Sequence, residues 1–516
     1  MPRLLIFLTL LVSSLSAQLS NTHVYQGEAV SAKKASFGGF MTAENGSFYT
    51  FGADYIGPEP FKSTGEFHIR KYDIETLDLQ SDIELNEFEF EGNETWFRKV
   101  IRTKNGIHTL FESHDPKRDV KYLLHRKLGV KGFTSLSKVI ATSNQKYQAN
   151  DVFTPYFSRD SSKVLIYADK ESSSSDVIPH IYILNGNFES IWDAPLSLSS
   201  DKKGIKPMGI TLSNNGAVYL LALADNGKIN ERDFTNTNYL IYKIDQKGSK
   251  VIHDFSQYPA PIHNGMIQAN MQGKLLFFAF IEDDSKASRC LSLFFDQTND
   301  KLISENQIDL EEFGQGLQAN RNNLFASLAN IRGLQRISFE NFFEWKDGSM
   351  TLLAEQYYQH GYEADPNTTF EAQNIMAITL NQSGDLKSAY IIPKSADVAA
   401  RAYSNINYYS YMAEKKDDEV QIFYNTHGEN LEQLGNSLSI KHNFGTFKMD
   451  IALVQANLNP EEGVTYHELN RITTSSIKKT RFLDTDRYLR IGSNQYIILY
   501  APSLYKFGFA KIKTFD

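Results

Sequence analysis

Apolar and polar residues alternate along the chain in short runs typical of β-strands, and residues 205–256 show this pattern most completely. This segment reads as a short strand, a turn at Asn214-Asn215-Gly216, an apolar strand, a polar stretch, an alternating strand ending at Asp245, a Lys247-Gly248 turn and a fourth strand. Four consecutive antiparallel strands form the unit of a β-propeller blade. The pattern therefore predicts an all-β chain built from four-stranded antiparallel blades.

The same unit recurs along the chain, because eight turn signals each precede an apolar strand. The signals are Asn45-Gly46, Asn105-Gly106, Asp160-Ser161-Ser162, Asn215-Gly216, Gln272-Gly273, Asp347-Gly348, Asp417-Asp418 and Ser493-Asn494. A second strand covered on both faces by neighbouring blades should be continuously apolar, whereas outer strands should alternate. We predict a single β-propeller over residues 18–516 with eight blades, seven being the alternative. The expected units are approximately residues 35–90, 95–142, 150–198, 205–256, 264–310, 337–394, 404–470 and 480–514.

The last unit contains only three strands, and an additional strand precedes the first unit at residues 23–30. Pairing the two would complete the last blade and remove two exposed sheet edges. We therefore predict that the N-terminal strand closes the ring, with an unpaired N-terminal arm as the alternative.

Residues 310–340 break the repeat. Leu324, Leu328 and Ile331 have the spacing of a short amphipathic helix. We favour a packed crossover between the fifth and sixth units over a helix that binds a partner.

The first seventeen residues have the pattern of a signal peptide. Arg3 precedes the apolar run 4–12, and small residues lead to Ala17. The apolar run is about half the ~20 residues that a membrane-spanning helix needs. We predict export to the periplasm, the cell surface or the extracellular space, with no membrane span. The one cysteine, Cys290, lies in an apolar segment and is expected to be a buried thiol.

One segment and the last third of the chain resemble known families. Residues 157–167 resemble the FSPDG-type motif of TolB-like propellers, although Arg159 replaces the usual Pro and Ser161 the usual Gly. Residues 352–358, 374–380, 391–394 and 505–511 look like a family of exported propeller-like proteins from Bacteroidota. That resemblance implies export and a repeat fold. The family carries no assigned activity, so no functional residue is transferred from it.

No catalytic or metal-binding motif is found. The sequence has no G-x-S-x-G nucleophile elbow, no H-E-x-x-H, no paired cysteines and no P-loop. The net charge is −8, and no basic block could neutralise several phosphates. We predict no catalytic residue, no metal ligand and no cofactor, and we expect no nucleic-acid partner.

Polar residues at equivalent places after the second strands provide the candidate binding site. If the strand register is right, these residues share one rim of the disc. The candidates are Glu112, His114, Asp169, Asp225, Glu282, Glu355, Tyr357, Tyr358, Asn425 and His427. Carboxylates and imidazoles there could bind a cation or perform acid-base chemistry, and tyrosines could stack on sugars or bind a protein. An ordinary solvated loop surface, with the tyrosines in the core, is the alternative.

Three functions are compatible with these observations. The leading hypothesis is an exported, non-catalytic propeller that binds an envelope or extracellular protein or glycan as a scaffold. The first alternative is a glycan-active lyase or hydrolase that uses rim carboxylates and histidines. The second is a propeller that binds a small ligand or a metal. The fold alone does not decide between them, because one fold hosts many functions.

Overall fold

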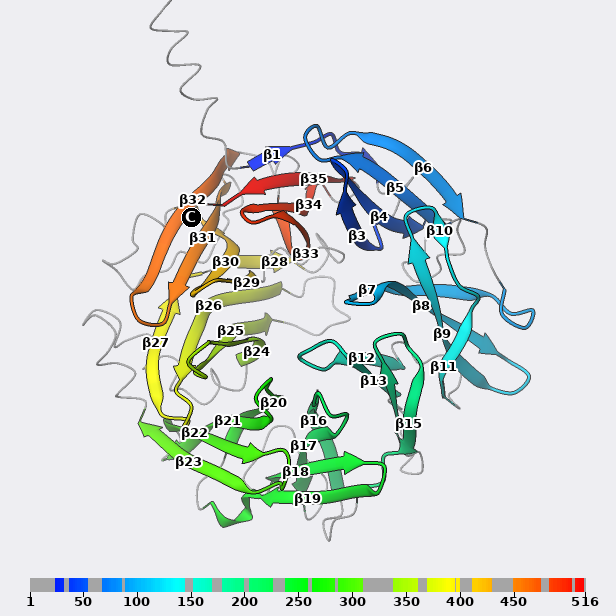
Figure 1. The fold of residues 1–516 in the computed structure, drawn as a ribbon. Helices are drawn as coiled ribbons and strands as arrows, with labels where there is room; N and C mark the ends of the chain where they lie inside the picture. Colours follow the sequence, from blue (N-terminus) through cyan, green and yellow to red (C-terminus); the bar gives the residue numbers. More distant parts are fainter. Residues whose placement is uncertain are drawn as a thin grey trace, which may run out of the picture.

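The computed structural model describes most of the chain as β-strands. The described residues are 24–31, 37–53, 67–85, 89–143, 152–168, 179–198, 204–225, 237–258, 262–283, 286–309, 337–360, 369–394, 396–399, 411–428, 449–474, 482–503 and 506–514. The strands form eight antiparallel sheets arranged as blades around a ring (Figure 1). The predicted eight-bladed propeller is therefore confirmed. The expected signal peptide, and residues 310–336 with the expected helix, lie outside the described residues.

Seven blades follow one another in sequence, each with its first strand nearest the ring centre. Blade 1 contains β3 (Gly39–Glu44), β4 (Ser47–Ala53), β5 (Phe67–Asp73) and β6 (Leu79–Leu85), and blade 2 contains β7 (Thr95–Thr103), β8 (Gly106–Asp115), β9 (Val120–Gly129), β10 (Gly132–Phe133) and β11 (Lys138–Ser143). Blade 3 contains β12 (Phe153–Phe157), β13 (Lys163–Ala168), β14 (His180–Asn185) and β15 (Ser190–Pro195), and blade 4 contains β16 (Gly204–Leu212), β17 (Val218–Asp225), β18 (Thr237–Asp245) and β19 (Gly248–Asp254). A 3-10 turn, η1 (Phe255–Gln257), follows β19.

Blade 5 contains β20 (Ile262–Ala269), β21 (Lys274–Asp283), β22 (Lys286–Asp296) and β23 (Leu302–Asp309). Blade 6 contains β24 (Ile337–Glu344), β25 (Met350–His360), β26 (Thr369–Leu380), β27 (Leu386–Ile392) and β28 (Ala396–Ala399), and blade 7 contains β29 (Tyr411–Lys416), β30 (Glu419–His427), β31 (Met449–Asn459) and β32 (Gly463–Thr474).

The N-terminal strand closes the ring, as predicted. Blade 8 contains β33 (Phe482–Gly492), β34 (Gln495–Ser503) and β35 (Lys506–Lys513), and its outer strand comes from β1 (Val24–Gln26) and β2 (Val30–Ser31). Val24 pairs with Ile512, and the Tyr500 hydroxyl donates a hydrogen bond of 2.5 Å to the Gly27 carbonyl. The beginning and the end of the described chain are therefore hydrogen-bonded to each other (Figure 1).

The antiparallel topology gives the disc two unlike faces. Turns between first and second strands, and between third and fourth strands, lie on one face, which we call the turn face. Examples are the turns at Asn45-Gly46 and at residues 381–385. The other connections lie on the opposite face, which we call the loop face. An example is the described turn at residues 116–119, which joins the second strand of blade 2 to the third.

The middle of each second strand is largely apolar because its two faces pack against different blades. In β21, Leu275 and Phe277 pack against blade 4, whereas Leu276 and Phe278 pack against blade 6. Cys290 is fully buried in the same blade, as expected from the sequence. The core is thus a ring of interfaces between blades.

Turns between third and fourth strands attach each blade to the one before it. The Phe188 ring of blade 3 is fully buried against blade 2, although its backbone has a φ of 62°. Asp300 of blade 5 accepts hydrogen bonds from Lys243 and Lys250 of blade 4 at 2.7 and 2.6 Å. Gly384 of blade 6 lies against blade 5 and accepts a hydrogen bond from Ser292 at 2.6 Å. These turns therefore fix the angle between neighbouring blades.

Candidate functional site

Most second strands are longer than expected, so every candidate residue except Asp169 lies inside a strand and not after it. β8 continues through Asp115, β25 through His360 and β30 through His427. Each polar residue still finds a partner on the third strand: His114, for example, pairs with Lys121. Backbone hydrogen bonds between two strands do not depend on the type of side chain. A strand can therefore continue past the point where its sequence changes from apolar to polar, and that change did not mark the strand end.

Glu112 and His114 lie at the loop end of the interface between blades 2 and 3. The Glu112 side chain is 3% exposed and accepts a hydrogen bond of 2.7 Å from Arg98. Arg98 is the extra residue of a β-bulge between Phe97 and Lys99, which redirects its side chain. His114 Nε2 lies 3.5 Å from an Asp119 carboxylate oxygen. Glu112 is therefore a buried carboxylate with its own cation.

Glu355 occupies a similar environment in blade 6. Its carboxylate contacts the Lys394 ammonium, and the two side chains are 3% and 0% exposed. A buried pair of opposite charges is retained only if each partner compensates the desolvation of the other. Both groups are thus held in one arrangement below the loop face.

Asn425 and His427 lie between blades 7 and 8. Phe423 on the same strand contacts Tyr496 of blade 8, with ring centroids 5.5 Å apart. Because side chains alternate along a strand, Asn425 and His427 share that face. Both are buried, at 2% and 8% exposure.

The remaining candidates are placed only in part. Asp225 lies in β17, Glu282 in β21, and Tyr357 and Tyr358 in β25, but their side chains are not described; Asp169 lies outside the described residues. The described candidates occupy three separate blade interfaces, and only Glu112 with His114 and Asn425 with His427 share one.

A cluster of charged residues at the ring centre was not found from the sequence. We call Arg102, Arg159, Glu344, Glu414 and Arg490 the axial cluster. Arg159 of blade 3 donates a hydrogen bond of 2.5 Å to the Phe342 carbonyl of blade 6, and its Nε lies 3.5 Å from a Glu344 oxygen. Glu344 also accepts the backbone N–H of Met271, from blade 5, at 3.0 Å. Residues of blades 3 and 6 can meet in this way only across the ring axis.

The second half of the axial cluster joins blades 2, 7 and 8. Arg490 donates to Glu414 at 2.6 Å. Arg102 interacts electrostatically with Tyr488 and Glu414, and desolvation lowers the pKa of its guanidinium despite these partners. The side chain of Arg102 is nevertheless exposed to solvent.

Only one member of the axial cluster left a signal in the sequence. Arg159 is the residue that replaces Pro in the segment resembling the TolB-type motif. A proline has no side-chain donor, so the replacement supplies the group that reaches blade 6. The other four members belong to strands whose register had to be known first.

Two histidines form a buried pair between blades 2 and 3, nearer the turn face. His108 Nδ1 and His125 Nε2 lie 2.8 Å apart, and Phe188 stacks on His125 with ring centroids 4.5 Å apart. Burial, assisted by Lys127, lowers the pKa of His108 to about 4. Burial, His108 and two lysines lower the pKa of His125 to about 3. Both rings are therefore neutral at neutral pH.

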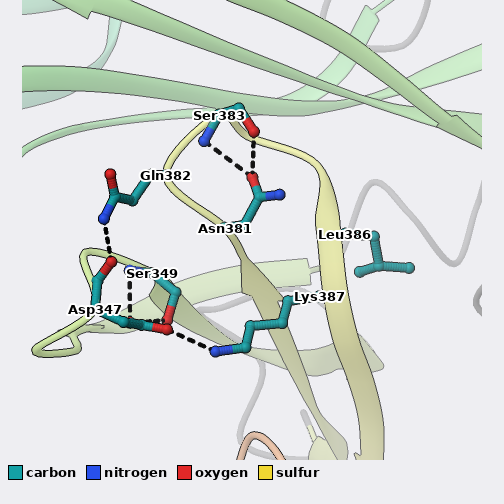
Figure 2. Close-up of a pocket in the computed structure, with 7 residues that line it drawn as sticks. All are labelled: Asp347, Ser349, Asn381, Gln382, Ser383, Leu386 and Lys387. Carbon is teal, nitrogen blue, oxygen red and sulfur yellow. Dashed lines mark hydrogen bonds and ion pairs between the residues drawn. The ribbon is translucent and has the colours of Figure 1, made fainter.

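A polar pocket of about 460 Å³ lies on the turn face of blade 6 (Figure 2). Lys387 points toward Asp347 and donates to its carboxylate at 2.7 Å, while Ser349 donates to the same group from its backbone and its hydroxyl. The hydrogen bonds from Lys387 and Ser349 lower the pKa of Asp347 to about 2, against a smaller opposing effect of desolvation. The Asp347 carboxylate is thus occupied by the protein itself, and none of the candidate residues lines this pocket.

Within the described ranges, no three histidine, cysteine or carboxylate side chains are grouped as metal ligands. The described part of the chain also contains no helix long and apolar enough to cross a membrane.

The strand topology defines the chain as a β-propeller. No protein-family model matches the sequence, and neither does any curated protein. Among solved structures, the β-propeller domain of the Trilobed protease from Pyrococcus furiosus is similar, with 10% identity, a TM-score of 0.35 and coverage of 84% of this chain and 96% of that chain. A post-proline cleaving enzyme from Rickettsia typhi has 13% identity, a TM-score of 0.38 and coverage of 90% of this chain and 57% of that chain. An ulvan lyase has 9% identity, a TM-score of 0.33 and coverage of 87% of this chain and 98% of that chain. At TM-scores below 0.5, these similarities add nothing to what the strand topology shows.

Proposed function

We propose that the chain is an exported, non-catalytic β-propeller that binds an envelope or extracellular protein or glycan on its loop face. The observation that carries the proposal is the set of buried polar residues at the loop ends of the second strands. Glu112 is paired with Arg98, and Glu355 is paired with Lys394. These ion pairs fix the position of both carboxylates beneath the loop face. Such fully paired groups give a rigid base to the connections above them.

The same pairing favours binding over acid-base chemistry. Two carboxylates that act together must approach the same substrate bond, whereas Glu112 and Glu355 belong to different blade interfaces. The predicted signal peptide and the resemblance to exported propeller-like proteins support the export part of the proposal.

A comparison of the two faces tests the proposal. Cys290 is fully buried, so a cysteine introduced at the surface can be labelled selectively. Lys117→Cys places it on the loop face and Lys104→Cys on the turn face of the same blade, at exposed residues. Each variant is labelled with a photocrosslinker and incubated with intact cells or isolated envelope. The wild-type protein is the labelling control.

We expect a discrete adduct from the Lys117→Cys variant and none from the Lys104→Cys variant. Equal labelling from both faces, or an adduct from the turn face alone, would overturn the assignment of the loop face. Release of new sugar ends from a glycan incubated with the unlabelled protein would overturn the non-catalytic part and favour the glycan-active enzyme.

A further inference from the structure

A solvent-exposed cation lies at the ring centre without a hydrogen-bonding partner among the described residues. Arg102 is located in the innermost strand of blade 2, one residue after the buried Ile101. Its electrostatic partners are Glu414 of blade 7 and Tyr488 of blade 8. Blade 1 separates blade 2 from blade 8 along the ring, so the side chain of Arg102 reaches toward the axis.

The carboxylate that interacts with Arg102 is already engaged, through one of its oxygens, by another cation. Glu414 accepts a hydrogen bond of 2.6 Å from Arg490, which also donates to the Ser493 carbonyl. Within this group of three side chains, two guanidiniums face one carboxylate. Asp417, an exposed turn residue, adds a second carboxylate that acts on Arg490. Arg102 itself still lacks a hydrogen-bonding partner among the described residues.

The other axial pair does not compensate the charge of Arg102. Arg159 and Glu344 interact with each other, and the Glu344 carboxylate also accepts the Met271 N–H. The Lys415 ammonium adds a further cation beside them, donating to the Glu344 carbonyl at 2.5 Å. An excess of positive charge at the centre contrasts with the net charge of −8 for the whole chain.

We propose that Arg102 is the principal cation of an oxyanion-binding site at the ring centre, which takes a carboxylate, sulfate or phosphate group of a ligand. A guanidinium presents two parallel N–H donors that match such a group. Partial desolvation strengthens this interaction relative to bulk water. The site lies at the axis, away from the candidate residues between the blades, and the proposal does not depend on which face binds a macromolecule.

The test uses the full chain and simple anions. Sulfate, phosphate and glucuronate are titrated separately by calorimetry at constant ionic strength, with chloride as the balancing anion. Binding to the native state also raises Tm by mass action. We expect at least one of these anions to bind the wild-type protein, and the rank order of the three identifies the preferred group.

The variant Arg102→Gln removes the charge, and Arg102→Lys keeps the charge but not the two parallel donors. We expect Kd to rise at least about tenfold for Arg102→Gln, with Arg102→Lys in between. The matched control is Arg118→Gln, which changes the charge equally at a 66% exposed side chain on the loop face. The control should bind like the wild type.

Two results would overturn the proposal. One is an unchanged Kd in a folded Arg102→Gln variant, and the other is the absence of binding by the wild-type protein for all three anions. Near-ultraviolet circular dichroism establishes that each variant is folded, and Arg102→Lys provides the comparison if Arg102→Gln does not fold.

Discussion

At the scale of single residues, burial decides which titratable groups are charged. His108 and His125 share one hydrogen bond in an interface where neither ring can be hydrated. Each has a folded-state pKa below its usual value because desolvation disfavours the imidazolium. The positive charges of Lys127 and Lys138 lower the pKa of His125 further.

The histidine pair should make the free energy of unfolding depend on pH. Between about pH 6.5 and pH 4 the unfolded chain binds protons that the folded chain does not, so stability should fall as the pH is lowered through this window. We expect a loss of about 1 kcal/mol or more between pH 7 and pH 5 that is absent from the double variant His108→Gln/His125→Gln. Denaturant titrations at both pH values measure it.

A suitable comparison is His180→Gln, which removes a partly exposed histidine paired with Asp193 at 2.8 Å. Because the buried pair is intact in this variant, it should retain the loss of stability between pH 7 and pH 5. Parallel pH profiles for the wild type and the double variant would contradict the assignment of the dependence to the buried pair.

At the scale of elements, the turns that join third and fourth strands determine how blades pack. Gly384 has a φ of 93°, and a Cβ there would lie 2.8 Å from Asn306 Nδ2 and 2.9 Å from a Phe294 ring carbon. Glycine is therefore required at position 384 for two reasons. The first is the positive φ of the backbone, and the second is the close approach of blade 5. Gly273 has a φ of 76° with nothing within 4 Å, so only the first cause applies there.

Replacing these glycines by alanine should separate the two causes. Gly273→Ala should cost about 1 kcal/mol of stability from backbone strain alone. Gly384→Ala should cost about 2–4 kcal/mol, because the clash with blade 5 is added. Denaturant midpoints of the two variants provide the measurement. Equal losses would mean that the contact with blade 5 adjusts without cost.

The elements themselves could be predicted because their signals are local. An Asn-Gly turn requires positive φ, as found for Asn45 and Gly46, and such a turn between apolar runs indicates a hairpin. The strand register could not be predicted in the same way. The bulge that turns Arg98 toward Glu112 has no sequence signature of its own, so the candidate carboxylate could be named but its partner could not.

The axial cluster shows the same limit more strongly. Arg159 and Glu344 are 185 positions apart in the sequence and meet only because the ring brings blades 3 and 6 face to face. Arg159 could be recognised in the sequence as a departure from a motif. Its contact with blade 6, however, could be predicted only from the arrangement of the blades around the axis. Contacts between residues on opposite sides of the ring axis are therefore the hardest to predict from the sequence.

At the scale of the whole molecule, ring closure should control how cooperatively the blades unfold. β1 and β2 supply the outer strand of blade 8, and Val24 is buried there at 9% exposure. Without this strand, blade 8 has an open edge, and only side-chain packing still joins blade 8 to blade 1. The effect should then reach blade 5, on the far side of the ring (Figure 1).

Cys290 of blade 5 reports on this effect without any label. Burial raises the pKa of its thiol, so the folded protein should react slowly with a thiol reagent. We expect removal of residues 1–31 to lower stability by about 3 kcal/mol or more and to accelerate the reaction of Cys290. Removal of residues 1–23, which leaves β1 in place, is the control. An unchanged reaction rate in the longer truncation would show that the blades open independently.

Closure by β1 also sets an order of events during biosynthesis. β1 precedes every other described strand, whereas its partner β35 follows them all. The two cannot pair until the ribosome has released everything between them, although the earlier blades can already form. A nascent chain stalled before residue 506 therefore carries its first strand without a partner, and the ring is completed only after every other described strand has been made.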